Sequence, residues 1–317
     1  LIFDLSSYCN FFSVSKLNVF KSASNYPVIL ILKKGSANRI VELSFAETEA
    51  EVTNGKFYKY LINKNDLDFL PANIIPVNTK EIDLKIVVRL IKDSERLNKY
   101  LKISEGLRIP KKYETETTAD FGIVKQYQFE KYTDIKRGSF ISKDDLAIVV
   151  SEKSSRFLNS QKEKIIIAED ALFITATLDN DKNIPQGGVY FGTRNSDDVS
   201  IKYILSLLNS KVLSFIYKIL FGGMHMGGGY LRYRTKFLEE LPIKIISKDN
   251  QIKIVDLVEK MLLLHRELKK VKAESERVAI ERQIDATDRQ IDELVYKLYG
   301  LTGDEIKIVE DSFKEKK

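Results

Sequence analysis

Residues 251–299 read QIKIVDLVEKMLLLHRELKKVKAESERVAIERQIDATDRQIDELVYKLY and contain neither proline nor glycine. The second half carries a heptad seam with one polar member, formed by Ile280, Ile284, Thr287, Ile291, Leu294 and Leu298. An earlier seam, out of phase with this one, is formed by Ile254, Leu257, Met261, Leu264, Leu268 and Val271. The phase slips within residues 273–276, which predicts an antiparallel hairpin of two helices with Ser275 as the N-cap of the second. One long helix with a stutter is the alternative.

The residues that follow the hairpin carry signals for helix ends. Gly300 is a predicted C-cap of the second helix. Thr302 and Glu305 have the spacing of a capping box, which predicts a last short helix.

Upstream of the hairpin, the hydrophobic pattern is mixed. It predicts β segments at Leu1–Leu5 and Tyr26–Leu32, a helix over Thr79–Leu101 with Thr79 as N-cap, and a helix over Ser200–Leu220. Further short strands are predicted from Ile103 onward and at Phe121–Val124, Leu146–Val150, Lys164–Ala168, Leu172–Thr177 and Gly188–Phe191.

The run Val28–Leu32 is apolar without interruption, which is typical of a strand covered on both faces in an α/β sheet. Two strands alone cannot form such a sheet. Its remainder is either missing from this chain or supplied by the residues that follow.

The composition of the 317-residue chain excludes several classes of protein. The lone Cys9 cannot form an internal disulfide, so we expect a reducing, cytoplasmic compartment. One Cys and two His cannot supply the four ligands of a usual structural zinc site. No apolar run approaches the roughly 20 residues of a membrane span, so we expect no membrane partner. The chain starts at Leu1 without Met, and we expect it to be part of a longer protein.

The positive charge is concentrated in the middle of the chain. The formal net charge is +6, of which residues 1–96 carry +2, residues 97–245 carry +5 and residues 246–317 carry −1. An anionic partner is therefore expected first in the middle segment, although a solvated charged face is the commoner explanation of such a run.

A search for catalytic motifs finds none. The chain has no Gly-x-Gly-x-x-Gly after a strand, no Walker loop and no Gly-x-Ser-x-Gly elbow. Asp145 with Glu152 and Lys153 faintly resembles a nuclease triad, but adjacent residues of a strand face opposite sides, which favours a solvated strand end. His225 and His265 have no Cys, Asp or second His at ligand spacing. We therefore predict neither a catalytic nor a metal site in this chain.

One stretch, residues 221–236, has the composition of a nucleic-acid contact. Five glycines lie within residues 222–229 and permit close approach of the backbone to another surface. Arg232, Arg234 and Lys236 follow at a period of two, with Tyr230 and Tyr233 among them. In an extended strand the three cations share one face, where they can contact phosphates or read guanine edges. A flexible connector followed by a polar strand is the alternative.

Several stretches of the chain resemble one family when they are taken in order. They are residues 19–32 (VFKSASNYPVILIL), 205–211 (LSLLNSK), 228–234 (GGYLRYR), 237–243 (FLEELPI), and the end IDELVYKLYGLT at 291–302 with Glu305, Ile306, Ile308, Val309 and Glu310. The middle stretches resemble the TaqI-like C-terminal specificity domain, which is the target-recognition part of N6-adenine DNA methyltransferases and of type IIG restriction-modification enzymes. The first stretch is similar to the last sheet strands of their methyltransferase domain.

The resemblance also implies what this chain lacks. Catalysis in the family needs an Asn-Pro-Pro-Tyr motif and a glycine-rich loop for S-adenosylmethionine, and neither occurs here. A type IIG nuclease motif is absent as well. The chain is therefore expected to bind DNA without modifying it and to hold no cofactor, while S-adenosylmethionine would bind the parent enzyme.

The predicted fold is α+β, with a strand-rich target-recognition domain and a C-terminal antiparallel helical hairpin. The predicted segments are terminal strands of a truncated methyltransferase domain at 1–35, a connector with a helix at 36–96, a DNA target-recognition domain at 97–245, and the hairpin tail at 246–317. The resemblance implies two partners, double-stranded DNA and the methyltransferase domain of the parent chain, in a restriction-modification system.

The predicted DNA-binding residues follow from the basic stretch and from the start of the recognition domain. They are Arg232, Arg234, Lys236, Tyr230, Tyr233, Gly228, Gly229, Arg108, Lys111 and Lys112. Two other functions stay open. A type I-like specificity subunit also combines recognition domains with long helices, but normally has two of each, and this chain shows no internal repeat. A protein-interaction module would use the helical hairpin as its surface.

Overall fold

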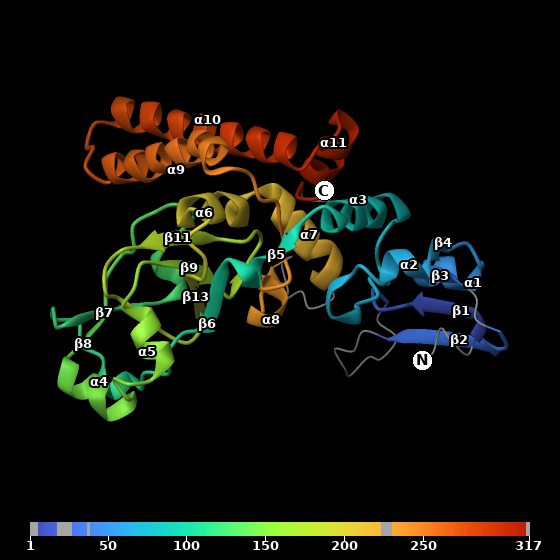
Figure 1. The fold of residues 1–317 in the computed structure, drawn as a ribbon, viewed down its shortest axis with the longest axis horizontal. Helices are drawn as coiled ribbons and strands as arrows, with labels where there is room; N and C mark the ends of the chain where they lie inside the picture. Colours follow the sequence, from blue (N-terminus) through green and yellow to red (C-terminus); the bar gives the residue numbers. More distant parts are fainter. Residues whose placement is uncertain (1–5, 18–26, 37–38, 223–229, 315–317) are drawn as a thin grey trace. The chain divides into compact units, whose positions relative to one another are not determined.

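The computed structural model describes residues 6–17, 27–36, 39–222 and 230–314 (Figure 1). The chain divides into two compact units. The first comprises residues 1–93 and 218–223, and the second comprises residues 94–217 and 224–317.

The first unit contains a four-stranded sheet with the order β2-β1-β3-β4. Strand β1 pairs in parallel with β3, whereas the β1–β2 and β3–β4 pairs are antiparallel. The strands are β1 (Ser6–Ser13), β2 (Val28–Lys34), β3 (Ile40–Phe45) and β4 (Tyr58–Asn63). The residues that follow thus supply two further strands, β3 and β4, to this sheet.

Two strands of this sheet differ from the predictions. Strand β1 was not predicted, because Ser6, Asn10 and Ser13 are polar residues that the fold buries, and the strand predicted at Leu1–Leu5 lies outside the described residues. Strand β2 is not covered on both faces. It is an edge strand, and its side chains from Val28 to Leu32 are 40–49% exposed.

The helix predicted over Thr79–Leu101 is shorter in the structure. Helix α3 spans Glu81–Lys92, and its N-cap is Lys80 rather than Thr79. Leu97 and Leu101 are fully buried in the second unit, where Leu101 begins a strand, so tertiary packing ends the helix early. The other helices of the first unit are α1 (Glu49–Thr53) and α2 (Lys64–Leu67).

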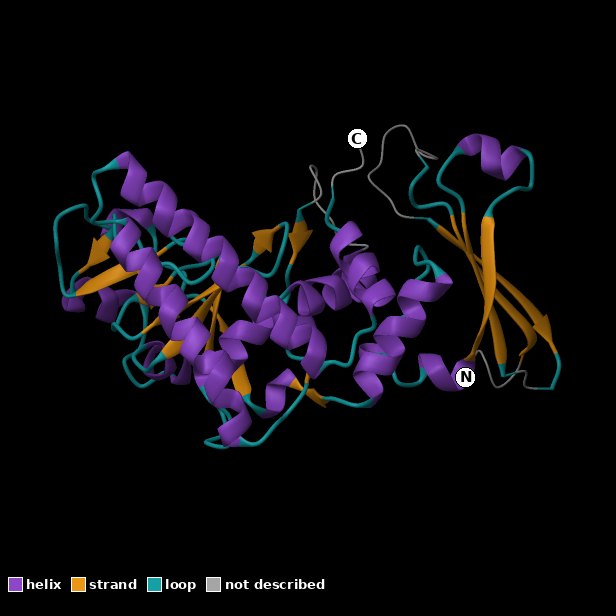
Figure 2. Ribbon diagram, turned by 90° about the horizontal axis from the view of Figure 1, so that it is seen from above, coloured by secondary structure: helices purple, strands orange, loops and turns teal. Residues whose placement is uncertain are grey.

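The second unit is built on an antiparallel sheet with the order β11-β9-β13-β6. Strand β9 is buried along its whole length. The four strands are β6 (Leu101–Glu105), β9 (Lys164–Ala168), β11 (Ala176–Asp179) and β13 (Val189–Arg194). Helix α6 packs on β9 and β11, and α9 of the hairpin packs on α6, so the unit has three layers (Figures 1 and 2).

A smaller subdomain lies beside this sheet. Its sheet has the order β12-β7-β8, and its core includes Leu107, Ile123, Ile141 and Phe157. The elements are β7 (Phe121–Val124), β8 (Phe140–Ile141), β12 (Ile184–Pro185), α4 (Lys143–Val149) and α5 (Ser155–Ser160). Two short ribbons complete the unit, β5 (Glu95–Arg96) with β15 (Pro242–Ile243), and β10 with β14, described below.

Two predicted strands of this unit differ from the structure. Residues Leu146–Val150 belong largely to helix α4, because Ser142 caps the helix by accepting a hydrogen bond from the Asp145 N–H at 3.1 Å. The strand predicted at Leu172–Thr177 begins later, at Ala176.

The helix predicted over Ser200–Leu220 is broken in two. Helix α6 spans Ile201–Asn209 and α7 spans Lys211–Phe221, with Ser210 extended between them (ψ 152°). The Ser210 hydroxyl accepts from the Leu213 N–H at 3.3 Å, so it satisfies a first-turn donor of α7. Among the described residues, no single helix is both long and apolar enough to cross a membrane; α6 and α7 pass that test only as a pair bent by 61°.

The C-terminal hairpin is confirmed. Helices α9 (Lys248–Leu268) and α10 (Glu274–Leu298) are separate and pack on each other, so the single long helix is excluded. Helix α10 starts one residue before Ser275, and its N-cap is Ala273. Gly300 adopts φ +63°, and Thr302 and Glu305 form the predicted capping box of α11 (Gly303–Asp311).

Candidate nucleic-acid interface

The basic stretch forms one strand of a short antiparallel ribbon. Strand β14 (Leu231–Arg232) pairs with β10 (Asp170–Ala171), and Arg232 lies opposite Asp170. The Tyr233 N–H donates to the Glu169 carbonyl at 2.7 Å, which extends the pairing by one residue. The ribbon therefore places two carboxylates directly beside the predicted arginines.

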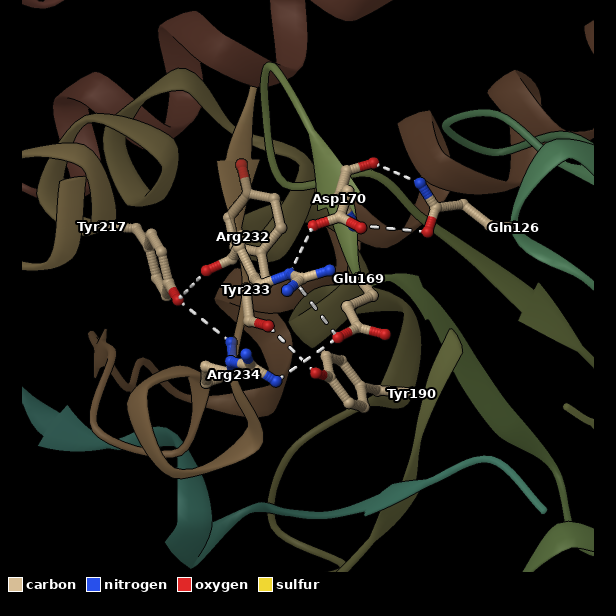
Figure 3. A network of polar contacts seen from close by, with 8 residues as sticks. All are labelled: Gln126, Glu169, Asp170, Tyr190, Tyr217, Arg232, Tyr233 and Arg234. Carbon is tan, nitrogen blue, oxygen red and sulfur yellow. Dashed lines mark hydrogen bonds and ion pairs between the residues drawn. The ribbon is translucent and has the colours of Figure 1, made fainter. Parts of the chain in front are cut away.

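Both arginines are held by these carboxylates (Figure 3). The Arg232 Nε donates to Asp170 Oδ1 at 3.1 Å, and it lies 3.9 Å from Glu169 Oε1. The Arg234 Nη1 lies 3.5 Å from the same Glu169 oxygen. The Arg232 and Arg234 side chains are 39% and 43% exposed, so both guanidinium groups remain open to a ligand. The hydrogen bond with Asp170 raises the pKa of Arg232.

Two buried tyrosines fix the main chain between the arginines. The Tyr217 hydroxyl donates to the Arg232 carbonyl at 3.0 Å and accepts from the Arg234 N–H at 3.0 Å. The Tyr190 hydroxyl donates to the Tyr233 carbonyl at 3.0 Å (Figure 3). Burial raises the pKa of Tyr190 to about 12, and Glu169 adds to the shift while Arg234 opposes it. These hydroxyls stay protonated at neutral pH and can act as fixed donors.

Arg108 and Arg234 meet at one cavity. The cavity has a volume of about 230 Å³, and its walls are Glu105, Gly106, Arg108, Glu169, Gly187, Gly188, Val189, Tyr190 and Arg234. A second hollow of about 320 Å³ shares Arg108 and Gly187. The structure thus brings together arginines from the two predicted groups, which are far apart in the sequence.

Gly106 and Gly188 allow the chain to form this wall. A Cβ on Gly106 would lie 2.1 Å from the Gln186 carbonyl oxygen, so no other residue fits there without moving the backbone. Gly188 adopts φ +93°, a conformation that L side chains rarely take.

The remaining predicted cations do not join the carboxylate network. Lys111 and Lys112 are exposed in a 3-10 turn, and the Lys112 ammonium lies 4.7 Å from the centre of the Tyr113 ring. The expectation that Lys236 shares a strand face with the arginines is wrong, because helix α8 (Thr235–Leu238) interrupts the extended chain. The Lys236 ammonium lies 4.7 Å from the Phe237 ring centre.

The predicted aromatic and glycine contacts have different outcomes. Tyr230 is 46% exposed and available at the surface. Tyr233 is fully buried and packs against Tyr217, with ring centroids 4.6 Å apart and the rings tilted by 53°, so we correct its predicted DNA contact to a packing role. Gly228 and Gly229 lie outside the described residues.

Several residues that build this site were not predicted. Glu169 and Asp170 escaped notice because an acidic pair is not expected at an anion-binding surface, although their position directly after the buried strand β9 is a readable signal. Gln126, Tyr190 and Tyr217 approach from three distant segments, and their roles depend on tertiary structure alone.

The predictions on catalysis and metals can be compared with the described residues. Within them, no three His, Cys, Asp or Glu side chains form a group that could hold a metal ion. The Asp145 carboxylate accepts from the Ser142 hydroxyl at 2.7 Å, so it takes part in a helix cap rather than lying at a strand end. His265 is half-buried on α9, and burial lowers its pKa. His225 lies outside the described residues.

Comparison with known proteins gives one family match. Residues 101–243 match the TaqI-like C-terminal specificity domain. No curated protein matches the chain.

Three solved structures are similar to parts of this chain. The type IIG restriction endonuclease BpuSI aligns with 94% of this chain and 44% of its own (11% identity, TM-score 0.43). A chain from a study of type I restriction-modification assembly aligns with 68% of this chain and 51% of its own (11% identity, TM-score 0.39). The HsdS subunit from Thermoanaerobacter tengcongensis aligns with 68% of this chain and 50% of its own (13% identity, TM-score 0.39). This chain thus spans about half the length of each structure.

Proposed function

Because residues 101–243 match the TaqI-like C-terminal specificity domain, we propose that this chain recognises a short sequence of double-stranded DNA in a restriction-modification system. The observation that carries the proposal is the pair Arg232 and Arg234, half-exposed on the β10–β14 ribbon and held in place by carboxylates. Arginine can donate two hydrogen bonds to the O6 and N7 atoms of guanine, which is a common specific contact in the major groove.

The other predicted cations would contact phosphates. Arg108, Lys111, Lys112 and Lys236 are exposed, and phosphate contacts position a protein on the duplex without reading its sequence. Tyr230 is the exposed aromatic residue of the basic stretch and would contact a sugar or a base edge.

The role of the parent enzyme follows from the family. We propose that the parent is an adenine-N6 DNA methyltransferase of the type IIG class, and that S-adenosylmethionine binds its methyltransferase domain. This chain would recognise the site and deliver the adenine to that domain. The sheet β2-β1-β3-β4 would be the terminal part of the methyltransferase domain, and the apolar, exposed strand β2 would be the edge that its remaining strands cover.

The hairpin has the properties of a spacer. Arg266 and Lys269 of α9 lie 3.1 and 3.5 Å from the Asp134 carboxylate. At the other end, the Asp292 carboxylate of α10 accepts from the Lys211 N–H at 3.1 Å. Contacts at both ends hold the hairpin against the recognition domain, which favours a rigid spacer over a free interaction surface.

DNA binding by the full chain tests the proposal. Fluorescence anisotropy on a labelled duplex between 50 and 200 mM salt should give a linear loss of log K with log salt. Arg232→Ala with Arg234→Ala should weaken binding and flatten that slope by less than about 2, because Glu169 and Asp170 partly neutralise the two guanidinium groups.

The control variant removes the same charge elsewhere. Arg277→Ala with Arg282→Ala changes two exposed arginines of α10, and binding should stay close to wild type. An absence of DNA binding at low salt would contradict the proposal and favour the protein-interaction module.

A further inference from the structure

The acidic residues beside the two arginines are unexpected at a surface proposed to bind a polyanion. Glu169 and Asp170 are only 18% and 24% exposed, and both contact the guanidinium groups. Two carboxylates beside two arginines leave the cluster with no net charge. Attraction to phosphates is therefore weak here compared with a cluster of cations alone.

We infer that Glu169 and Asp170 are positioning residues that set specificity by directing Arg232 and Arg234 to base edges and away from phosphates. The inference rests on the proposed function and assigns a role to two residues for which that function gives none.

The geometry leaves part of the Arg232 guanidinium group available to a base edge. A guanidinium group carries five N–H donors, and the hydrogen bond to Asp170 uses Nε. The two terminal nitrogens of Arg232 therefore remain for a bidentate partner. A carboxylate on Nε also fixes the plane of the group, because it blocks rotation about the last side-chain bonds.

The main chain that carries the two carboxylates is itself held in place. The Gln126 side chain donates to the Asp170 carbonyl at 2.5 Å and accepts from the Asp170 N–H at 3.3 Å (Figure 3). The Glu169 N–H donates to the Gly188 carbonyl at 3.4 Å, and its carbonyl accepts from Tyr233. Support of this kind keeps a binding group within the narrow range of positions that recognition needs.

The acids also discriminate against the wrong ligand. A phosphate that approaches Arg232 or Arg234 must come close to a carboxylate of like charge, which costs free energy. A guanine edge carries no net charge and escapes this penalty, and a carboxylate can in addition accept from a cytosine amino group. The acids therefore lower the affinity for random DNA more than the affinity for the recognised sequence.

The experiment measures this discrimination on the full chain. A random duplex library is first selected on the wild type, and Kd is then measured for the selected duplex and for a scrambled duplex of equal composition. The variants are Glu169→Gln and Asp170→Asn, which keep the size of each side chain. In either variant, the ratio of the two affinities should fall at least tenfold, mainly through tighter binding of the scrambled duplex, and the salt slope on that duplex should steepen.

The control is Glu163→Gln. Glu163 is exposed just before the start of β9, and its removal changes the charge by the same amount, but no ion pair joins it to Arg232 or Arg234 among the described contacts. The affinity ratio of this variant should match the wild type. A fall equal to that of Glu169→Gln would mean that net charge alone matters, and would overturn the inference.

Other outcomes separate the two proposals. If the wild type selects no sequence, the proposed function fails and the inference fails with it. If the wild type selects a sequence and both variants keep its affinity ratio and slope, DNA recognition stands and the inference is wrong. Equal weakening on both duplexes, with the ratio and the slope unchanged, would indicate a merely structural role and would overturn the inference.

Discussion

The two ends of strand β9 carry ion pairs of opposite character. At its start, Lys164 lies 2.7 Å from the Asp179 carboxylate, and the two side chains are 0% and 2% exposed. Just after its end, Glu169 and Asp170 contact Arg232 and Arg234, which are 39% and 43% exposed. The two ends of one strand thus carry one sealed pair and one open pair, which is Arg232 with Asp170.

Burial decides what each pair can do. The Lys164 ammonium also donates to the Asp181 carbonyl at 2.9 Å, and Asp179 Oδ1 accepts from Asn183 at 2.9 Å, so each charge of the sealed pair has a second polar partner. Burial lowers the pKa of Lys164 and raises that of Asp179, because it penalises both charges more than their attraction compensates. The open pair keeps contact with water, and the terminal nitrogens of its guanidinium group can bind a ligand while Asp170 stays on Nε. The first pair therefore serves the fold, and the second is suited to recognition.

Breaking the sealed pair should cause the largest loss of unfolding free energy. Asp179→Ala leaves the Lys164 ammonium buried without its partner, and such a change costs about 3–5 kcal/mol of unfolding free energy. Urea unfolding of the full chain measures this loss. The corresponding change in the open pair, Asp170→Ala, should cost less than about 1 kcal/mol.

A double variant checks the cause. Lys164→Met with Asp179→Leu removes both charges together, and it should recover most of the stability that Asp179→Ala loses. A double variant as unstable as Asp179→Ala would mean that the packing, rather than the unpaired charge, is responsible.

The main-chain support of the open pair should give the next largest effect. Tyr217→Phe keeps the ring on Tyr233 but leaves the Arg232 carbonyl and the Arg234 N–H without this hydroxyl. An unsatisfied buried polar group costs about 1–3 kcal/mol, and urea unfolding measures it. Tyr296→Phe is the control, because the hydroxyl partner of Tyr296 is Glu310, which is 44% exposed and stays hydrated. Equal losses in the two variants would contradict the idea that the ribbon is fixed by buried hydrogen bonds.

The comparison also shows what the sequence could predict. The hairpin and the capping box at Thr302 depend on local periodicity and spacing, and both were predicted. Strand β1 and the break at Ser210 were not, because buried serines and a hydrogen bond from a distant helix depend on tertiary contacts. The family match confirms the resemblance that the sequence predicted.

The candidate site was predicted only in part, because several of its residues also depend on tertiary contacts. Arg232 and Arg234 stand out in the sequence because they alternate with aromatic residues. The sequence places Asp170 and Glu169 more than 60 residues away from them, and their role becomes visible only when β10 pairs with β14. Tyr233 was misjudged because alternation cannot tell which face of an isolated ribbon is buried.

His265 on α9 is a half-buried titratable side chain, so its burial is intermediate between the sealed pair and the open pair. Burial lowers its pKa below the ordinary 6.5, against the opposing effects of Glu130, Asp134 and Asp288 and with the help of Lys269. The folded chain then binds fewer protons than the unfolded chain, so stability is lost as the pH falls through 6.5 toward the lowered pKa. His265→Gln should remove that part of the pH dependence of the unfolding free energy. The change should be smaller than the loss of unfolding free energy in Tyr217→Phe. Thermal unfolding between pH 7.5 and about 5 measures it, and an unchanged pH profile would contradict the assignment.

The smallest effect is expected for the open pair itself. A double-mutant cycle of Arg232→Ala and Asp170→Ala should give a coupling free energy of about 0.2–1 kcal/mol at low salt, the range of exposed pairs. At 1 M salt the Debye length is only about 3 Å, so the coupling should nearly vanish. The same cycle on Lys164 and Asp179 should keep its coupling at 1 M, because ions do not reach a buried pair. If the Arg232–Asp170 coupling also survived 1 M salt, both ion pairs would be shielded from solvent. The open pair would then stabilise the fold rather than form a surface that can bind DNA.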